Sequence, residues 1–214
     1  MSLPVTRPLL YLITRGEAGP ANFSQKKKEI LDIVRAAVDA GVNLIQIREK
    51  DLEGRQLFEI VLAAVEIAAG SKTLILASER FDVAIAAGAH GVHLPARALA
   101  SATVRKIVPG GFLIGVSTHN AGEIESAVSG EADFVTFGPI FDSSGKGPPV
   151  ELDELSKICK QFPDLPVIAL GGINETNLNA TIDAGAAGIA AIRLLNDPVT
   201  LAEIAARVKQ HNFR

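Results

Sequence analysis

The chain alternates short runs of β-branched and other apolar residues with longer segments in which apolar residues recur every three or four positions. A short apolar run between turn residues is typical of a buried strand, and the longer period is typical of an amphipathic helix. The predicted strands span residues 9–14, 43–48, 73–78, 91–94, 112–117, 134–138, 167–171 and 189–193.

Helical periodicity separates these runs. The predicted helices include residues 25–40, 53–69, 81–87, 98–108, 121–129, 152–161 and 176–184, and Gly41, Gly88 and Gly185 each follow the end of one. Eight strands, each followed by a helix, predict an α/β fold of the (β/α)8 TIM-barrel type, although a doubly wound open sheet shares much of this pattern. No linker or composition shift divides the chain, so a single domain covering residues 1–214 is expected.

Composition narrows the class of protein. The 214 residues are 48% hydrophobic and 21% charged, with a net charge of -3, and the longest basic run is Lys26-Lys27-Lys28. We therefore expect no nucleic-acid partner. No apolar stretch has the length of a membrane span and no signal peptide is recognisable, so a cytoplasmic protein without a membrane partner is expected. The single cysteine, Cys159, excludes an intramolecular disulfide and is interpreted as an apolar filler.

The strand at residues 43–48 carries the first candidate chemistry. Because side chains alternate along a strand, Gln46, Arg48 and Lys50 share one face, and Ile45 and Ile47 the other. Burying such polar groups is costly unless an anion meets them. We interpret this face as a phosphate or diphosphate site; alternatively, Glu49 or Glu79 neutralises Arg48 inside the barrel.

Polar residues also follow most of the other predicted strands. They lie at the carboxyl ends of the strands, which is the side of a (β/α)8 barrel where active sites are found. Ser78, Ser117 and His119 follow or end strands of this kind. The loop at residues 141–149 is rich in glycine, serine and proline, which indicates either a mobile lid or a plain surface loop.

A second anion site is predicted after the seventh and eighth strands. Gly171 and Gly172 allow backbone N–H groups to approach a ligand, and Arg193 ends the predicted eighth strand. The alternative for Arg193 is an outward side chain paired with Asp197.

Several segments together resemble the thiamin phosphate synthase/TenI superfamily. They occur in the order of that superfamily and cover nearly the whole chain: Leu10-Tyr11-Leu12-Ile13-Thr14, Gln46-Ile47-Arg48-Glu49-Lys50, Ala89-His90-Gly91-Val92-His93-Leu94, Ile114-Gly115-Val116-Ser117-Thr118-His119, Phe137-Gly138-Pro139-Ile140-Phe141 and Ala169-Leu170-Gly171-Gly172-Ile173.

The resemblance implies a small-molecule substrate and specific roles. A synthase of this family joins hydroxymethylpyrimidine diphosphate to a thiazole phosphate and releases pyrophosphate with the help of Mg2+. By this resemblance, the diphosphate would be bound by Gln46, Arg48, Lys50 and the lid residue Lys146. Ser117 would face the pyrimidine, and Gly172 with the end of the eighth strand would hold the thiazole phosphate. The resemblance also implies a homodimer.

The chain departs from the synthase pattern at the metal. Ser78-Glu79-Arg80 stands where synthases have Asn-Asp-Arg, and the turn at residues 95–98 has no carboxylate, with Ala98 at the place of the second Asp. Glu79 would be the sole protein carboxylate on Mg2+, and no cofactor is otherwise expected. The lid motif Thr-x-Thr-Lys appears as Ser143-Ser144-Gly145-Lys146, and Arg193 replaces a serine.

The TenI branch lacks the paired metal ligands and moves a proton within a thiazole carboxylate phosphate. His119 matches its catalytic histidine, and imidazole exchanges protons near neutral pH; alternatively, residues 118–120 only cap a helix. His90 and His93 are expected to be structural. The leading hypothesis is a thiazole tautomerase, the alternative is a divergent synthase, and a third is a non-catalytic regulator that binds a phosphate ligand.

Overall fold

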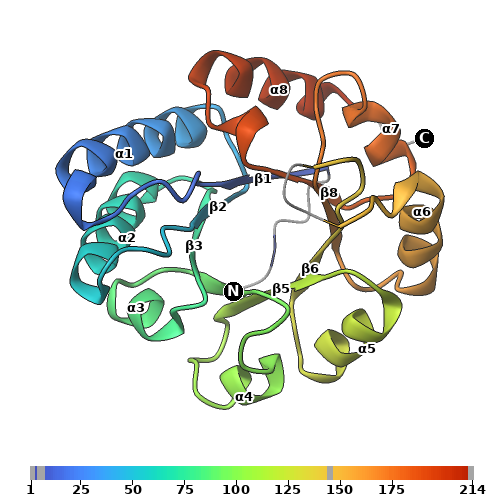
Figure 1. Ribbon diagram of the computed structural model, residues 1–214, viewed down its shortest axis with the longest axis horizontal. Coiled ribbons are helices and arrows are strands. Elements are labelled where there is room, and N and C mark those ends of the chain that lie inside the picture. Colours follow the sequence, from blue (N-terminus) through green and yellow to red (C-terminus); the bar gives the residue numbers. More distant parts are fainter. Residues whose placement is uncertain (1–2, 4–7, 144–146, 212–214) are drawn as a thin grey trace.

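Eight parallel strands close into a barrel at the centre of the molecule (Figure 1). The computed structural model describes residues 3, 8–143 and 147–211. Each strand pairs in parallel with the next, and β8 pairs with β1. The strands are β1 (Leu9–Ile13), β2 (Leu44–Ile47), β3 (Leu74–Ser78), β4 (Gly91–Leu94), β5 (Leu113–Thr118), β6 (Phe134–Phe137), β7 (Val167–Leu170) and β8 (Gly188–Ala191). The predicted (β/α)8 barrel is confirmed, and the open sheet is excluded.

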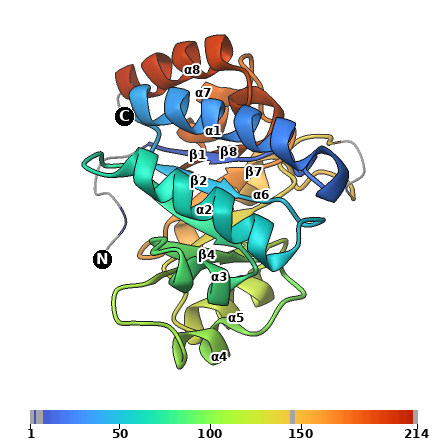
Figure 2. The same cartoon turned by 90° about the vertical axis from the view of Figure 1, so that its left-hand side faces the viewer.

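Helices surround the barrel, and α8 lies beside α1 where the ring closes (Figures 1 and 2). They are α1 (Phe23–Asp39), α2 (Gly54–Ala68), α3 (Phe81–Ala86), α4 (Ser101–Arg105), α5 (Ala121–Ser129), α6 (Glu151–Gln161), α7 (Leu178–Asp183) and α8 (Pro198–Gln210), with 3-10 helices η1 (Pro20–Asn22) and η2 (Arg193–Leu195). The helix α8 is not among the predicted helices, although Asp197 caps it by accepting a hydrogen bond from the Thr200 N–H. Within the described ranges, no helix combines the length and apolar character needed to cross a membrane.

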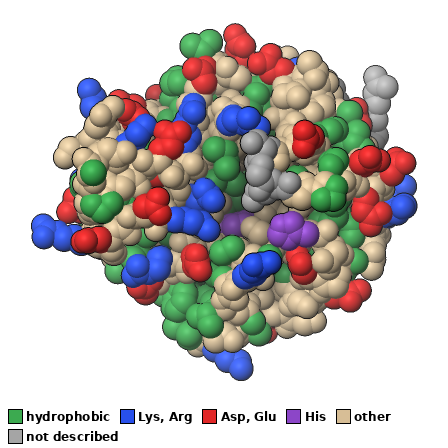
Figure 3. Space-filling model, viewed as in Figure 1, with side chains coloured by type: hydrophobic (Ala, Val, Ile, Leu, Met, Phe, Trp, Pro, Cys, Tyr) green, Lys and Arg blue, Asp and Glu red, His purple; other side chains and the backbone are tan. Residues whose placement is uncertain are grey.

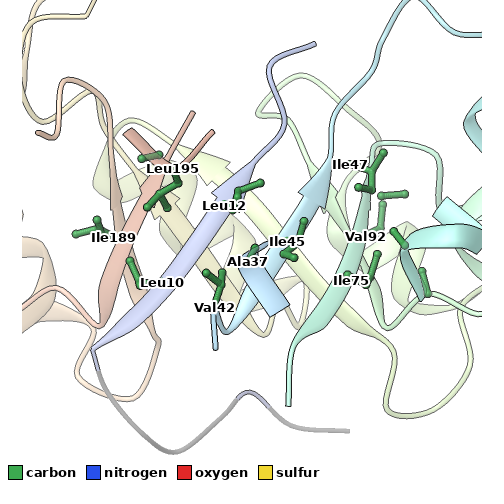
Figure 4. Packing of buried hydrophobic residues seen from close by; sticks show 14 of the residues in the cluster. Leu10, Leu12, Ala37, Val42, Ile45, Ile47, Ile75, Val92, Ile189 and Leu195 are labelled. Carbon is green, nitrogen blue, oxygen red and sulfur yellow. The ribbon is translucent and has the colours of Figure 1, made fainter. Parts of the chain in front are cut away.

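The two faces of the strands pack into different cores. The barrel interior contains a small cluster that includes Leu44, Leu76 and Phe134. The larger cluster fills the layer between strands and helices, where Ile45 and Ile47 lie (Figure 4). Alternation along β2 therefore sends its isoleucines outward and Gln46 inward, as predicted.

The eighth strand is shorter than predicted. It ends at Ala191, and Ile192 has helical dihedrals (φ -93°, ψ -73°) that start η2. The prediction that Arg193 ends this strand is therefore wrong, because the backbone turns before it. Arg193 instead opens η2, just beyond the carboxyl end of β8.

Glu49 is buried directly after β2 and holds the loop that follows β1. Its Oε1 accepts a hydrogen bond from the Gly16 N–H at 3.1 Å, and its Oε2 accepts one from the Ala18 N–H at 2.9 Å. The carboxylate thus satisfies two loop donors that would otherwise lack a partner. This explains why an acidic residue is only 3% exposed.

We expect Glu49→Ala to lower the free energy of unfolding by about 2–3 kcal/mol, because two partly or fully buried N–H groups lose their acceptor. Urea denaturation at neutral pH measures this. Glu53→Ala is the matched control, since Glu53 is exposed and makes no side-chain cap hydrogen bond. Equal shifts of the two midpoints would contradict the prediction.

Candidate functional site

A cavity of about 880 Å³ opens at the carboxyl ends of the strands. All eight strands contribute to its wall: Ile13, Gln46, Ser78, His93, Ser117, Thr136, Leu170 and Ala190 belong to β1 to β8 in that order. On the face shown in Figure 3, Lys and Arg side chains gather beside histidine near the centre. The closed barrel thus brings together segments that are far apart in the sequence.

The cavity collects most of the predicted site residues. Its lining includes Gln46, Arg48, Lys50, Ser78, Ser117, His119, Ser143, Gly171, Gly172 and Arg193. Glu79 is exposed and is not part of this lining. Lys146 lies outside the described residues, as does the centre of the predicted lid. The cavity therefore supports the grouping of these residues, and their individual roles stay predictions.

The β2 side of the cavity presents donors. The buried Tyr11 hydroxyl donates to Gln46 Oε1 at 3.2 Å, which leaves the Gln46 amide N–H groups for the cavity. Burial raises the pKa of Tyr11 well above 10, so this hydroxyl stays protonated. Arg48 is half-buried, and its backbone N–H is fixed by Thr14 Oγ1 at 2.8 Å. The β2 side of the cavity thus presents the Arg48 guanidinium and the Gln46 amide from a hydrogen-bonded backbone.

Arg48 has no ion-pair partner among the described residues. Glu49, one of the two carboxylates considered for this role, is instead bound to Gly16 and Ala18. The alternative in which Glu49 neutralises Arg48 is therefore wrong. The guanidinium remains available to an anion in the cavity.

On the opposite side, Gly171 and Gly172 follow β7 with φ of +103° and +66°, values that favour glycine. A Cβ at Gly172 would lie 2.6 Å from Phe141 Cβ and from the carbonyl oxygen of Asp142. Close packing against the loop after β6 is therefore one reason for glycine here. The same loop carries Ser143 to the cavity wall.

Arg193 places a second cation on the β8 side of the cavity. Its side chain is exposed and lines the opening. The described residues show no ion pair between Arg193 and Asp197, and Asp197 Oδ1 instead accepts from the Thr200 N–H at 2.9 Å. The cavity thus has cationic groups on two sides.

His119 stands at the mouth, just after β5, and is held by Glu123. The imidazole Nδ1 lies 3.1 Å from Glu123 Oε2, and that same oxygen accepts the His119 backbone N–H at 2.8 Å. Asn120 caps α5 by accepting the Glu123 N–H at 3.0 Å, and its own amide donates to Glu123 Oε1. Asn120 therefore caps α5 while Glu123 holds the His119 ring, so capping does not exclude a role for the histidine. A carboxylate on Nδ1 leaves Nε2 as the ring nitrogen for a ligand.

His93 belongs to the cavity lining, and its expected structural role stays a prediction. Its Nε2 lies 2.9 Å from Ser117 Oγ and 3.4 Å from Thr136 Oγ1. His90, by contrast, accepts the Ile75 N–H through Nδ1 at 3.0 Å between neighbouring strands, which is a structural role.

The residues present do not fit a Mg2+ site organised by the protein. Asp142 is the carboxylate in the described cavity lining, and Glu79 lies outside it. Among the described residues, no group of three or more His, Cys, Asp or Glu could hold a metal ion. Ala96 and Arg97 occupy the turn after β4. Hard cations such as Mg2+ need oxygen ligands, which this wall supplies sparsely.

Sequence reasoning missed Glu123, Thr136 and Asp142. Asn120 and Glu123 show the spacing of a capping box, which is a recognisable signal. His119 and Glu123 are also four residues apart at a helix start, where their side chains meet. No comparable signal marks Thr136, whose neighbour His93 lies two strands away in the sequence.

Comparison with known proteins agrees with this architecture. Residues 10–195 match the TMP-TENI family, described as thiamine monophosphate synthase. A putative thiamine-phosphate synthase of Geobacter sulfurreducens is 41% identical over 88% of this chain and 87% of its own. The thiamine-phosphate synthase of Methanoculleus marisnigri is 41% identical over 75% of this chain and 77% of its own.

Among solved structures, the thiamine phosphate pyrophosphorylase of Pyrococcus furiosus is similar, with a TM-score of 0.80, 28% identity and coverage of 94% of both chains. Sequence and structure thus agree over most of the chain. We conclude that this chain is an enzyme of thiamin biosynthesis that belongs to the thiamine monophosphate synthase family.

Proposed function

We propose that this enzyme is a thiazole phosphate tautomerase that works without a metal bound by the protein. The observation that carries the proposal is the His119 and Glu123 pair at the mouth of the cavity, with Nδ1 and the carboxylate oxygen 3.1 Å apart. A base oriented by a carboxylate is an arrangement suited to proton transfer.

The two cationic sides of the cavity suit a substrate with two anionic groups. A thiazole carboxylate phosphate carries a carboxylate and a phosphate. Gly171, Gly172 and Arg193 would hold the phosphate, while Arg48 and Lys50 would attract the carboxylate. The substrate would then lie across the floor with its ring near His119.

In the proposed reaction, Nε2 of His119 removes a proton from a ring carbon, and the electron pair of that C–H bond enters the ring system. The same nitrogen returns the proton at the second position, and the ring becomes aromatic. No atom is gained or lost. Glu123 would stabilise the imidazolium formed in between and would keep the ring oriented throughout.

The direct test is to incubate the enzyme with the non-aromatic thiazole carboxylate phosphate and to follow formation of the aromatic isomer, with and without a chelator. Turnover unaffected by the chelator is the expected result. Failure to accelerate the isomerisation, in protein that binds the compound, would contradict the proposal.

A second candidate is thiamin phosphate synthase activity. Relatives with 41% identity carry that name, and the donors on β2 suit a diphosphate. Mixing hydroxymethylpyrimidine diphosphate with thiazole phosphate, with Mg2+ or with a chelator, measures it. Mg2+-dependent formation of thiamin phosphate would favour this second function.

We expect Arg48→Ala to weaken binding of either phosphate ligand by about 1.5–3 kcal/mol, because a charge-assisted hydrogen bond is lost. Isothermal titration calorimetry at fixed salt measures the affinity. Arg55→Ala is the control, since Arg55 is exposed on α2 and outside the cavity lining. Unchanged affinity in Arg48→Ala would remove Arg48 from the site.

A further inference from the structure

His93 combines deep burial with a position at the cavity floor. The residue is 3% exposed, and its ring centroid lies 5.7 Å from that of Tyr11 and 5.8 Å from that of Phe134. Both aromatic rings pack against the imidazole at tilted angles. The proposed reaction does not use this histidine.

The two ring nitrogens of His93 have different surroundings. Nε2 lies within hydrogen-bonding distance of two hydroxyl oxygens, Ser117 Oγ at 2.9 Å and Thr136 Oγ1 at 3.4 Å, and the Ser117 contact is the shorter. Nδ1 is buried and has no hydrogen-bond partner among the described residues. It faces Gly115, where a Cβ would lie only 2.7 Å away. The Gly115 backbone therefore packs closely against the Nδ1 side of the ring.

This asymmetry selects one tautomer. A neutral imidazole has one N–H donor and one acceptor nitrogen. A buried donor without a partner is rarer in proteins than an acceptor with spare capacity. The proton therefore belongs on Nε2, where Ser117 Oγ accepts it, and the bare lone pair belongs on Nδ1.

We propose that His93 is a positioning residue that sets the direction of the hydrogen bond with Ser117 at the cavity floor. By donating from Nε2 to Ser117 Oγ, it leaves the Ser117 hydroxyl proton to be donated into the cavity. Ser117 Oγ has no other hydrogen-bond partner among the described residues, and Ser117 lines the cavity. The Ser117 hydroxyl then favours a ligand that has a hydrogen-bond acceptor facing it. Such an acceptor is a ring nitrogen or a carboxylate oxygen. This deepens the proposed function and rests on it only in taking the cavity as the substrate site.

The charged form of His93, which donates from both nitrogens, is not available near neutral pH. Burial lowers the pKa of His93 from 6.5 to about 3. The neighbouring Tyr11 also stays neutral, because burial raises its pKa well above 10. The direction of the hydrogen bond between His93 and Ser117 therefore does not change with pH near neutrality.

The tautomer is measured directly by 15N NMR on the intact protein labelled at its four histidines. His93→Gln identifies the signals of His93 by their loss. We expect a protonated Nε2 and a bare Nδ1 with no change between pH 6 and pH 8. A protonated Nδ1 would overturn the proposal, whatever reaction the enzyme catalyses.

A binding experiment tests the consequence for ligands. The probes are a thiazole phosphate and its thiophene analogue, which has C–H in place of the ring nitrogen. We expect the native protein to prefer the thiazole by about 10-fold and Ser117→Ala to lose this preference. His93→Gln, whose amide can donate to Ser117, should keep more of it than His93→Leu.

The outcomes separate the two proposals. If Ser117→Ala still prefers the thiazole to the thiophene, Ser117 is not the donor and the proposed role of His93 is overturned. Failure of both probes to bind the native protein would count against the proposed function instead, and the NMR result would still decide the tautomer. Ser117→Ala also keeps the test decisive if His93→Leu does not fold.

Discussion

His119→Gln is expected to lower the rate of thiazole phosphate tautomerisation by about 10²- to 10⁴-fold, the usual contribution of a general base, and to leave ligand affinity nearly unchanged. Glutamine keeps a polar side chain at the mouth but cannot exchange a proton near neutral pH. Because His119 is half exposed and bound through Nδ1 to Glu123, the substitution should not disturb the barrel. The affinity for the phosphate ligand depends on cations elsewhere in the cavity.

Steady-state rates and calorimetric affinities, measured on the same preparations, separate these effects. His211→Gln makes the same chemical change outside the described cavity lining and should behave as the native enzyme. Glu123→Gln, which keeps a hydrogen-bonding group near Nδ1 but removes its charge, should reduce the rate by less than His119→Gln. A full rate in His119→Gln would assign the proton transfer to another group.

Acid is expected to destabilise the native protein through His93. Its folded-state pKa of about 3 lies below the ordinary value of 6.5, so the unfolded chain binds the proton more readily. The stability contributed by neutral His93 is fully present above pH 6.5 and is lost as the pH falls from 6.5 toward 3. The loss is about 1.4 kcal/mol per pH unit, or up to about 5 kcal/mol over the whole window.

Urea denaturation of the native protein and of His93→Gln, at pH 7.5 and 4.5, measures this contribution. Other groups also titrate in this range, so the difference between the two proteins isolates His93. We expect the native protein to lose about 2.5–3 kcal/mol more than the variant. Ser117→Ala keeps the histidine and should retain the native acid sensitivity. Parallel losses in the native protein and His93→Gln would contradict the prediction.

The linear pattern was enough to predict the (β/α)8 barrel, and it predicted that polar residues gather at the carboxyl ends of the strands, where the cavity lies. The alternation in β2 placed Ile45 and Ile47 against the helices and Gln46 inside, because the strand repeat of two positions leaves only two faces. The family also followed from sequence, since its motifs occur in order along most of the chain. These are properties of local pattern and of residue order.

The partners of the polar groups follow only from the three-dimensional arrangement of the barrel. Glu49 was a candidate to neutralise Arg48, yet its carboxylate binds the loop after β1. The apolar pattern predicts a strand that reaches Arg193, but β8 ends at Ala191. The pairing of His93 with Ser117 joins two neighbouring strands whose spacing in the sequence carries no signal. Hydrogen bonds across a closed barrel depend on strand register and side-chain rotamers, and a linear pattern specifies neither.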